Sequence, residues 1–201
     1  VRLLEKRTYG WITGIKLASL AFKAGEFNQQ SLINFSGSHH DVSDFFAEQV
    51  LSTQAEEVKR FLLKTSLLDR FCAELCDHAL DTNKSRAILD NIENSGLFLI
   101  GLDRNRQWYR YHPLFRDFLN RQLHDANYGG AKNIMLRAAD WFNQRNNRQE
   151  AIEILLRAEE PEKAAEILEH CSQDWTYHGR ISLVMRYIER CLLYTSDAAD
   201  D

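Results

Sequence analysis

The clearest candidate for chemistry in this sequence is a histidine among arginines. Asp117 is the only acid close to His112, and five arginines surround it along the chain: Arg104, Arg106, Arg110, Arg116 and Arg121. Such side chains hold anions by charge-assisted hydrogen bonds. A histidine at a helix start can also donate to a phosphate oxygen near the positive end of the helix dipole. The pattern predicts either an anion site at His112 or a histidine packed beneath its neighbours and satisfied by backbone.

Two further clusters hold side chains that can ligate metals. Cys72 and Cys76 are four residues apart with His78 nearby, so a reversed turn would bring three zinc ligands together. A fourth ligand at a suitable spacing is missing, and we expect the cysteines to pack as small buried hydrophobes. His39 and His40 can bind a cation or titrate near neutrality, but we expect exposed loop residues there. We therefore predict no metal.

Sequence signatures of common enzymes are absent. The chain has no glycine-rich loop followed by Lys-Ser or Lys-Thr, no His-Glu-x-x-His metal motif and no Gly-x-Ser-x-Gly nucleophile elbow. We predict that this chain is not an enzyme and that it cannot bind and hydrolyse a nucleoside triphosphate alone.

Composition narrows the class of protein. The 201 residues are 44% hydrophobic, which suffices for a core, and the net charge of -4 argues against a general nucleic-acid or anionic-membrane surface. No apolar run approaches the ~20 residues of a membrane helix, and no signal peptide is recognisable. The four cysteines are irregularly spaced, which is typical of reduced thiols. We expect a cytoplasmic protein that does not contact a membrane.

The elements that would position His112 form a wing and a helix. Residues 97–102 are apolar and residues 107–111 are aromatic-rich, and the polar stretch 103–106 between them has turn composition. Pro113 then suits the first turn of a helix with Leu114, Phe115, Phe118 and Leu119 on one face. Together with helices before it, the hairpin predicts a winged helix.

The rest of the chain is predicted to be helical. The expected helices cover residues 1–24, 41–52, 53–65 (with a capping box from Thr53 to Glu56), 71–79, 81–95, 131–145, 149–158 and 161–171. We predict a mainly α chain with four parts: the C-terminal part of a helical domain (1–52), a winged helix (53–127), the start of a tetratricopeptide-like α-superhelix (128–191) and an artefactual tail (192–201) that resembles translated adapter sequence.

A DNA-reading role is not expected for the winged helix. In the helix that would enter the major groove, Lys84 and Arg86 are balanced by Asp90 and Glu93. Groove reading needs basic or amide side chains facing phosphates and bases. We therefore predict no direct DNA contact from this segment.

Four stretches in fixed order resemble the bacterial MalT-like, LuxR-type ATP-dependent transcriptional activators, which are signal-transduction ATPases. They are YGWITGIKLA (9–18), FSGSH (35–39), FLLKTSLLDR (61–70) and WYRYHPLF (108–115). The resemblance covers residues 3 to about 190. It implies an internal fragment, with a nucleotide-binding domain before it, an inducer-sensing superhelix at its end and a DNA-binding helix-turn-helix beyond.

The resemblance also implies functional residues. His112 is similar to the winged-helix histidine that contacts the nucleotide phosphate in the ADP-bound form, although Pro113 stands where many relatives carry an acid. Gly10 and Trp11 would lie near the adenine, although the family's usual proline is absent there. ATP or ADP would be bound by the parent protein and not by this fragment alone.

The mechanism implied by the resemblance is a switch. With ADP bound, His112 would hold the winged helix on the protein's own nucleotide-binding domain. Inducer at the downstream superhelix and exchange to ATP would release it and permit self-association. The alternative is a free-standing adaptor in which winged helix and helical repeats bind protein partners without nucleotide.

Overall fold

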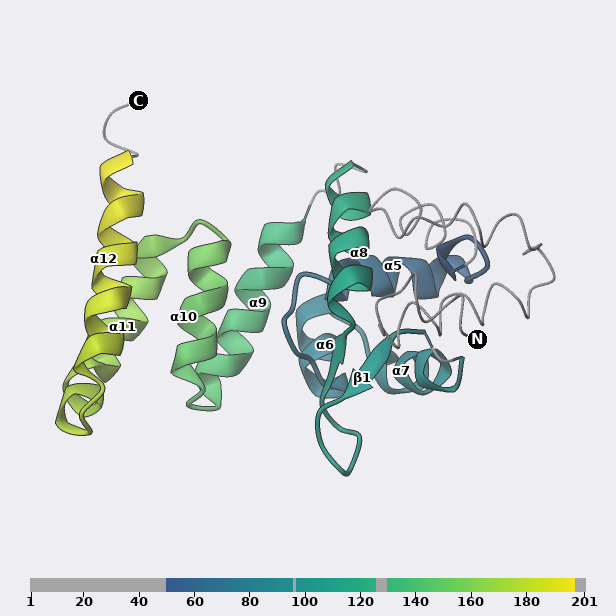
Figure 1. The fold of residues 1–201 in the computed structure, drawn as a ribbon, viewed down its shortest axis with the longest axis horizontal. Helices are drawn as coiled ribbons and strands as arrows, with labels where there is room; N and C mark the ends of the chain where they lie inside the picture. The colour runs from purple at the N-terminus through teal and green to yellow at the C-terminus, as the bar shows by residue number, and fades with distance from the viewer. Residues whose placement is uncertain (1–49, 96, 126–129, 198–201) are drawn as a thin grey trace, which may run out of the picture. The chain divides into compact units, whose positions relative to one another are not determined.

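The structure is a computed structural model that describes residues 50–95, 97–125 and 130–197 (Figure 1). The chain divides into two compact units, residues 1–59 and 60–201, and the first is described here only over 50–59. The described residues are mainly helical with one two-stranded antiparallel sheet. This confirms the predicted mainly α class and the two-stranded wing.

The winged helix consists of four helices and two short strands. They are α5 (Glu56–Thr65), α6 (Ala73–Leu80), α7 (Ser85–Asn94), β1 (Leu99–Gly101), β2 (Tyr109–Tyr111) and α8 (Pro113–Asp125). The prediction that Pro113 opens the closing helix is confirmed. Its fixed φ suits the first helical position, where no amide donor is needed.

The wing sets which side chains face inward. Leu99 pairs with Tyr111 and Gly101 with Tyr109, and Tyr109 also exchanges two backbone hydrogen bonds with Phe71. Because side chains alternate along a strand, Tyr109 and Tyr111 are buried and Arg110 is exposed. The second strand is thus held on both sides.

Three predicted helix starts were wrong. Helix α5 begins at Glu56, three residues after the predicted start at Thr53, and the Thr53 hydroxyl donates to the carbonyl of Val50 at 3.0 Å. The helix after Phe71 begins at Ala73, because Phe71 is engaged by the wing. Neither Asp81 nor Thr82 starts α7; the Asp77 carboxylate, on the preceding helix, accepts from the Ser85 amide at 3.0 Å. A cap supplied from another helix leaves no local sequence signal.

A buried aromatic cluster joins the wing to α8. Tyr111 packs against Phe71 and Phe115, with ring centroids 4.8 and 5.8 Å apart, and Phe115 stacks on Phe118. The Tyr111 hydroxyl lies 2.7 Å from the Thr65 hydroxyl. Burial raises the pKa of Tyr111, so this phenol stays neutral. The packing of Tyr111 therefore fixes the end of β2, and His112 follows directly in the chain.

Two helical hairpins follow the winged helix. Their helices are α9 (Ala131–Gln144), α10 (Arg148–Arg157), α11 (Pro161–Tyr177) and α12 (Ile181–Asp197), and successive helices lie side by side (Figure 1). The start of α11 lies 30 residues after that of α9, which agrees with the predicted repeat length. The assignment to the tetratricopeptide class stays a prediction.

Two helix ends differ from expectation. The periodicity predicts an end near Cys171 for α11, but this helix continues to Tyr177. Helix α12, which was not predicted as a separate helix, runs past the predicted end of the repeats at residue 191 to Asp197. Trp175 explains the first extension, because it is buried beside Tyr187. The predicted boundary between winged helix and repeats falls on residues 126–129, outside the described residues.

The small-residue pairs Ala138–Ala139 and Ala164–Ala165 predict close approach of helices, and the second pair contributes a single buried residue. Ala138 and Ala139 are both buried, and so is Ala164, but Ala165 is exposed. Of this pair, only Ala164 therefore allows close approach of α11 to its neighbours.

Among the described residues, no helix is long and apolar enough to cross a membrane.

Candidate functional site

His112 lies at the joint between β2 and α8. Its amide donates to the Phe98 carbonyl at 2.8 Å, and its own carbonyl accepts from the Arg116 amide at 3.0 Å. The first bond ties the joint to the beginning of the wing, and the second closes the first turn of α8. His112 as a whole is half-buried, and its Nδ1 atom is buried.

Burial keeps the His112 ring neutral. The pKa of His112 is below its ordinary value, first because burial penalises the charged form and then because Arg110 lies nearby. A neutral imidazole carries one N–H donor and one acceptor. At neutral pH this ring can donate one hydrogen bond to an anion without itself being a cation.

Two of the five arginines near His112 in sequence pair with acids of other elements. Arg106 pairs with Glu93 at 3.0 Å, and Arg116 pairs with Asp69 at 2.6 Å. Arg110 acts on the pKa of His112 and projects from the exposed face of β2. Arg106 and Arg116 are therefore engaged elsewhere, and Arg110 is the arginine of this set that acts on the His112 ring.

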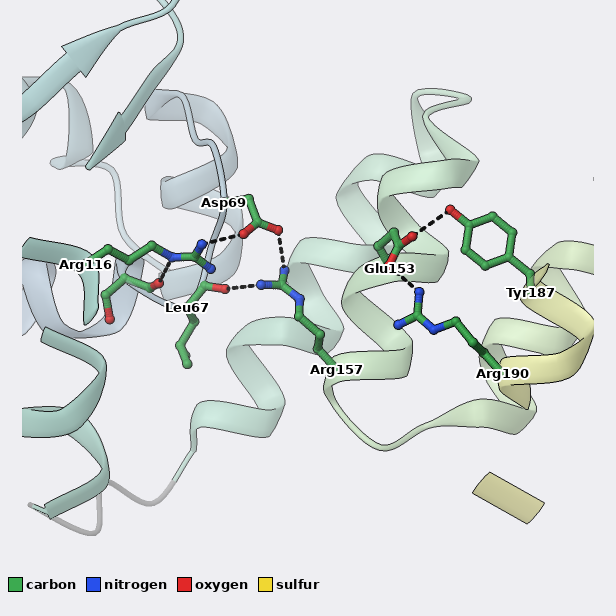
Figure 2. Close-up of polar contacts among 8 residues, drawn as sticks. Leu67, Asp69, Arg116, Glu153, Arg157, Tyr187 and Arg190 are labelled. Carbon is green, nitrogen blue, oxygen red and sulfur yellow. Dashed lines mark hydrogen bonds and ion pairs between the residues drawn. The ribbon is translucent and has the colours of Figure 1, made fainter. Parts of the chain in front are cut away.

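A second set of polar residues connects the winged helix to the repeats (Figure 2). Asp69, in the turn after α5, accepts from Arg116 of α8 on one oxygen and faces Arg157 of α10 on the other, 3.1 Å away. Arg116 also donates to the Ser66 carbonyl at 2.9 Å, and Arg157 donates to the Leu67 carbonyl at 3.3 Å. We call Asp69, Arg116 and Arg157 the Asp69 triad.

The Asp69 triad lies partly in water. The side chain of Asp69 is 60% exposed, whereas those of Arg116 and Arg157 are 25% and 31% exposed. Burial lowers the pKa of Arg157 and Asp69 opposes this, so the guanidinium remains charged. Ion pairs at such exposure contribute little to stability, but the two pairs connect α8 and α10 through one carboxylate.

Aromatic packing strengthens the same contact. Arg70 pairs with Glu150 of α10, and its guanidinium lies over the Trp108 ring, 5.0 Å from the centroid. Trp108 in turn packs on Trp141 and Phe142 of α9, at centroid distances of 6.0 and 6.1 Å. Trp108, directly before β2, therefore packs together with the turn after α5 and with the first hairpin, α9 and α10.

A third polar cluster joins α10 to α12. Glu153 accepts from the Tyr187 hydroxyl at 2.9 Å and from Arg190 at 2.7 Å (Figure 2). Burial would raise the pKa of Glu153, but Arg190 and Tyr187 hold it below its ordinary value. One face of α10 is therefore bound to the winged helix through Arg157, and Glu153, one turn earlier, binds the last described helix.

The predicted metal candidates gain no support in the described residues. Cys72 and Cys76 are buried as free thiols, and burial raises the pKa of each. His78 points to Asp140, 3.5 Å away. No group of three potential metal ligands occurs in the described part of the chain. His39, His40, Gly10 and Trp11 lie outside the described residues.

Sequence reasoning missed the Asp69 triad. Asp69 and Arg70 lie at the end of the FLLKTSLLDR stretch (61–70), and no sequence pattern singled out Arg157. The available signal was a charged pair directly after the apolar run at Leu67 and Leu68. Its partners are 47 and 88 residues further on, so no local pattern identifies them.

Comparison with known proteins agrees with this architecture. Residues 47–130 match the MalT winged helix domain. The chain is 28% identical over 190 residues to the serine/threonine-protein kinase PknK of Mycobacterium tuberculosis, covering 94% of this chain and 17% of that protein. It is 29% identical over 179 residues to the HTH-type transcriptional regulator MalT of Klebsiella pneumoniae, covering 87% of this chain and 20% of that protein.

These matches confirm the resemblance to MalT-like regulators. The chain contains a winged helix of the MalT type, and most of its length is similar to a segment of a transcriptional regulator and to a segment of a protein kinase. It spans about a fifth of the length of the relatives it matches. The residue roles implied by the resemblance, at His112, Gly10 and Trp11, stay predictions.

Proposed function

We propose that this chain is the central regulatory segment of a bacterial ATP-dependent, LuxR-type activator that acts in the cytoplasm. The segment couples the nucleotide state of a preceding domain to inducer sensing in the helical repeats, and so controls DNA binding elsewhere in the parent protein. It acts as a switch and not as an enzyme, and it leaves direct DNA contact to another domain.

The observation that carries this proposal is the Asp69 triad. Arg116 lies one turn of α8 after His112 and is bonded to its carbonyl, and Asp69 connects Arg116 to Arg157 of α10. A rearrangement of the repeats that moves Arg157 therefore acts on the helix that begins at His112. This is a physical connection of the kind that coupling requires.

His112 supplies the nucleotide end of the coupling. Its half-buried neutral ring has the donor needed to hold a phosphate oxygen. ADP or ATP, when bound by the parent protein, supplies that oxygen. In the ADP-bound form, His112 keeps the winged helix on the nucleotide-binding domain, and exchange to ATP together with inducer releases it for self-association.

The two kinds of relative favour a switch that is separate from the domain that carries out the protein's final activity. One is named as a transcriptional regulator and the other as a protein kinase, yet the same stretch of this chain aligns with both. What the segment contributes is therefore better placed in sensing and coupling than in DNA reading. The balanced charges of α7, where Arg86 pairs with Asp90 at 3.1 Å, agree with this.

The test uses the intact parent regulator with a promoter reporter. We expect His112→Ala to raise the inducer-free signal several-fold, because the resting contact is lost. Asp69→Asn is expected to weaken the response to inducer, because the repeats no longer act on α8. Asp90→Asn is the matched control: it removes one carboxylate from a surface pair on α7 and should change neither signal.

The outcomes separate the alternatives. An unchanged or lower inducer-free signal in His112→Ala contradicts the nucleotide contact. A normal inducer response in Asp69→Asn contradicts coupling through the triad. If the parent protein lacks a nucleotide-binding loop and a helix-turn-helix, the adaptor is the better account.

A further inference from the structure

A cleft separates the wing from the first hairpin on the side of the Asp69 triad. Its volume is about 310 Å³, at the lower end of the range for small-molecule sites. The winged helix contributes Asp69, Arg70, Leu102 and Arg110, and helices α9 and α10 contribute Phe142, Gln149, Glu150, Glu153, Ile154 and Arg157. His112 is not among the lining residues, so this cleft is distinct from the predicted nucleotide contact.

The acids of the cleft are already neutralised by arginines. Asp69 faces both Arg116 and Arg157, Glu150 is paired with Arg70, and Glu153 accepts from Arg190 and Tyr187. A cationic ligand would have to displace one of these pairs. The three acids are matched by five arginines, namely the three that line the cleft together with Arg116 and Arg190.

Two arginines of the cleft, Arg110 and Arg157, have donors that a ligand can use. Arg110 is exposed and has no carboxylate partner within the described part of the chain. Nε and Nη2 of Arg157 are buried although the side chain is 31% exposed, so any exposure among its polar atoms is at Nη1. Nη1 donates one hydrogen to the Leu67 carbonyl, which leaves its second N–H for the cleft.

The remaining wall is apolar. Leu102 is 44% exposed and is one of few large hydrophobic side chains with such exposure among the described residues. Phe142 and Ile154 complete this side of the cleft. An apolar group of a ligand would cover Leu102 while its charged end reached the arginines.

We infer that this cleft binds a small organic anion, with one carboxylate or phosphate held by Arg110 and Arg157 and a short apolar body against Leu102. The ligand would touch both the wing and α10 and would therefore stabilise the contact between them. The inference rests on the charges and walls of the cleft and does not depend on the proposed nucleotide switch.

The test measures binding of simple probes to the 201-residue chain by isothermal titration calorimetry. The anionic probes are phenyl phosphate and 3-phenylpropionate, which distinguish phosphate from carboxylate. Benzyl alcohol and benzylamine provide neutral and cationic comparisons, and inorganic phosphate lacks the apolar body. We expect at least one organic anion to bind about tenfold more tightly than all three comparison probes.

Variants then locate the site. Arg110→Gln should weaken binding of the organic anion about tenfold, and Leu102→Ser should weaken it while leaving inorganic phosphate unchanged. Arg104→Gln removes an equal charge from the tip of the same wing, outside the cleft, and should have less than about a twofold effect. His112→Ala should also leave probe affinity unchanged, which separates this site from the switch.

Several results would overturn the inference. The inference fails if neither organic anion shows saturable binding, or if benzylamine or inorganic phosphate binds as tightly as the organic anions. It also fails if Arg104→Gln weakens binding as much as Arg110→Gln does. Arg110 is at an outward position of β2, so loss of folding is not expected. Circular dichroism of each variant checks this directly.

Discussion

The protonation of His112 can be measured without the parent protein. Its pKa is lowered from the ordinary 6.5, first by burial and then by Arg110. We expect the Arg110→Gln variant to bring the pKa part of the way back, because burial remains. Arg104→Gln, which changes a charge at the wing tip, should leave it in place. Proton NMR titration of the ring signals, with His112→Gln for assignment, measures all three values.

The lowered pKa of His112 also determines the direction in which the stability of the fold changes with pH. The unfolded chain takes up this proton at a higher pH than the folded chain does, so His112 destabilises the fold as the pH drops below 6.5 and has no effect well above it. Arg110→Gln should reduce this loss of stability at low pH. A His112 pKa at or above 6.5 in the unchanged chain would contradict both expectations.

The candidate site was predictable at His112 but not at Asp69. His112 was identified because a turn, an aromatic strand and a proline lie in one continuous stretch, and its place at the β2–α8 joint follows from these local signals. Its arginine neighbours were misleading, since Arg116 points to Asp69 and Arg106 to Glu93. Proximity along a sequence does not determine on which side of a strand or helix a side chain lies.

The contact between α8 and α10 through Asp69 is open to a double-mutant cycle. We expect Asp69→Asn and Arg157→Gln to couple by about 0.5 kcal/mol in urea unfolding of the chain, because Asp69 is largely in water. The cycle should show a smaller coupling in high salt, since exposed ion pairs are screened.

A matched cycle on α7 controls for general charge effects. Arg86 and Asp90 form an (i,i+4) pair on the surface of one helix, which contributes about 0.3 kcal/mol without linking separate elements. Strict additivity of the Asp69 and Arg157 variants would contradict a direct contact between the winged helix and the repeats.

Close packing of α11 predicts that substitutions at two adjacent alanines differ sharply in their effect on stability. Ala164 is fully buried and Ala165 is exposed on the same helix. Ala164→Leu should destabilise the chain by about 1–3 kcal/mol, because added methylenes must displace close neighbours. Ala165→Leu should stay within about 0.5 kcal/mol of the unchanged chain in the same unfolding experiment. Equal effects would mean that α11 is rotated from the orientation described.

The helices were predictable to the extent that their signals are local. The starts of α8, α9 and α11 follow from Pro113, Gly130 and Pro161, which are adjacent to the helices they begin. The start of α7 could not be found in this way, because Asp77 belongs to the preceding helix. The length of α11 depends on Trp175 packing against Tyr187, a contact between different helices.

The repeats end in an apolar surface on α12. Its inward side chains, Val184, Tyr187 and Cys191, are buried, whereas the outward side carries Ile181, Met185, Ile188 and Leu192. These four residues follow helical spacing and form one stripe, which we call the α12 stripe. Terminal repeats that act as caps carry a polar outer face. The α12 stripe has the opposite character, because its side chains are apolar and exposed.

The α12 stripe makes a prediction about the chain in solution. Met185 and Leu192 are 51% and 62% exposed, and a contiguous apolar surface of this kind favours association. We expect the 201-residue chain to self-associate, and Met185→Lys to weaken that association at least about tenfold in sedimentation equilibrium, because a charge must then be buried. Ser182→Lys adds the same charge to an exposed position outside the stripe and should change little. A chain that is monomeric at all concentrations, or equal effects of the two lysines, would mean that this surface is not a docking face for another helix.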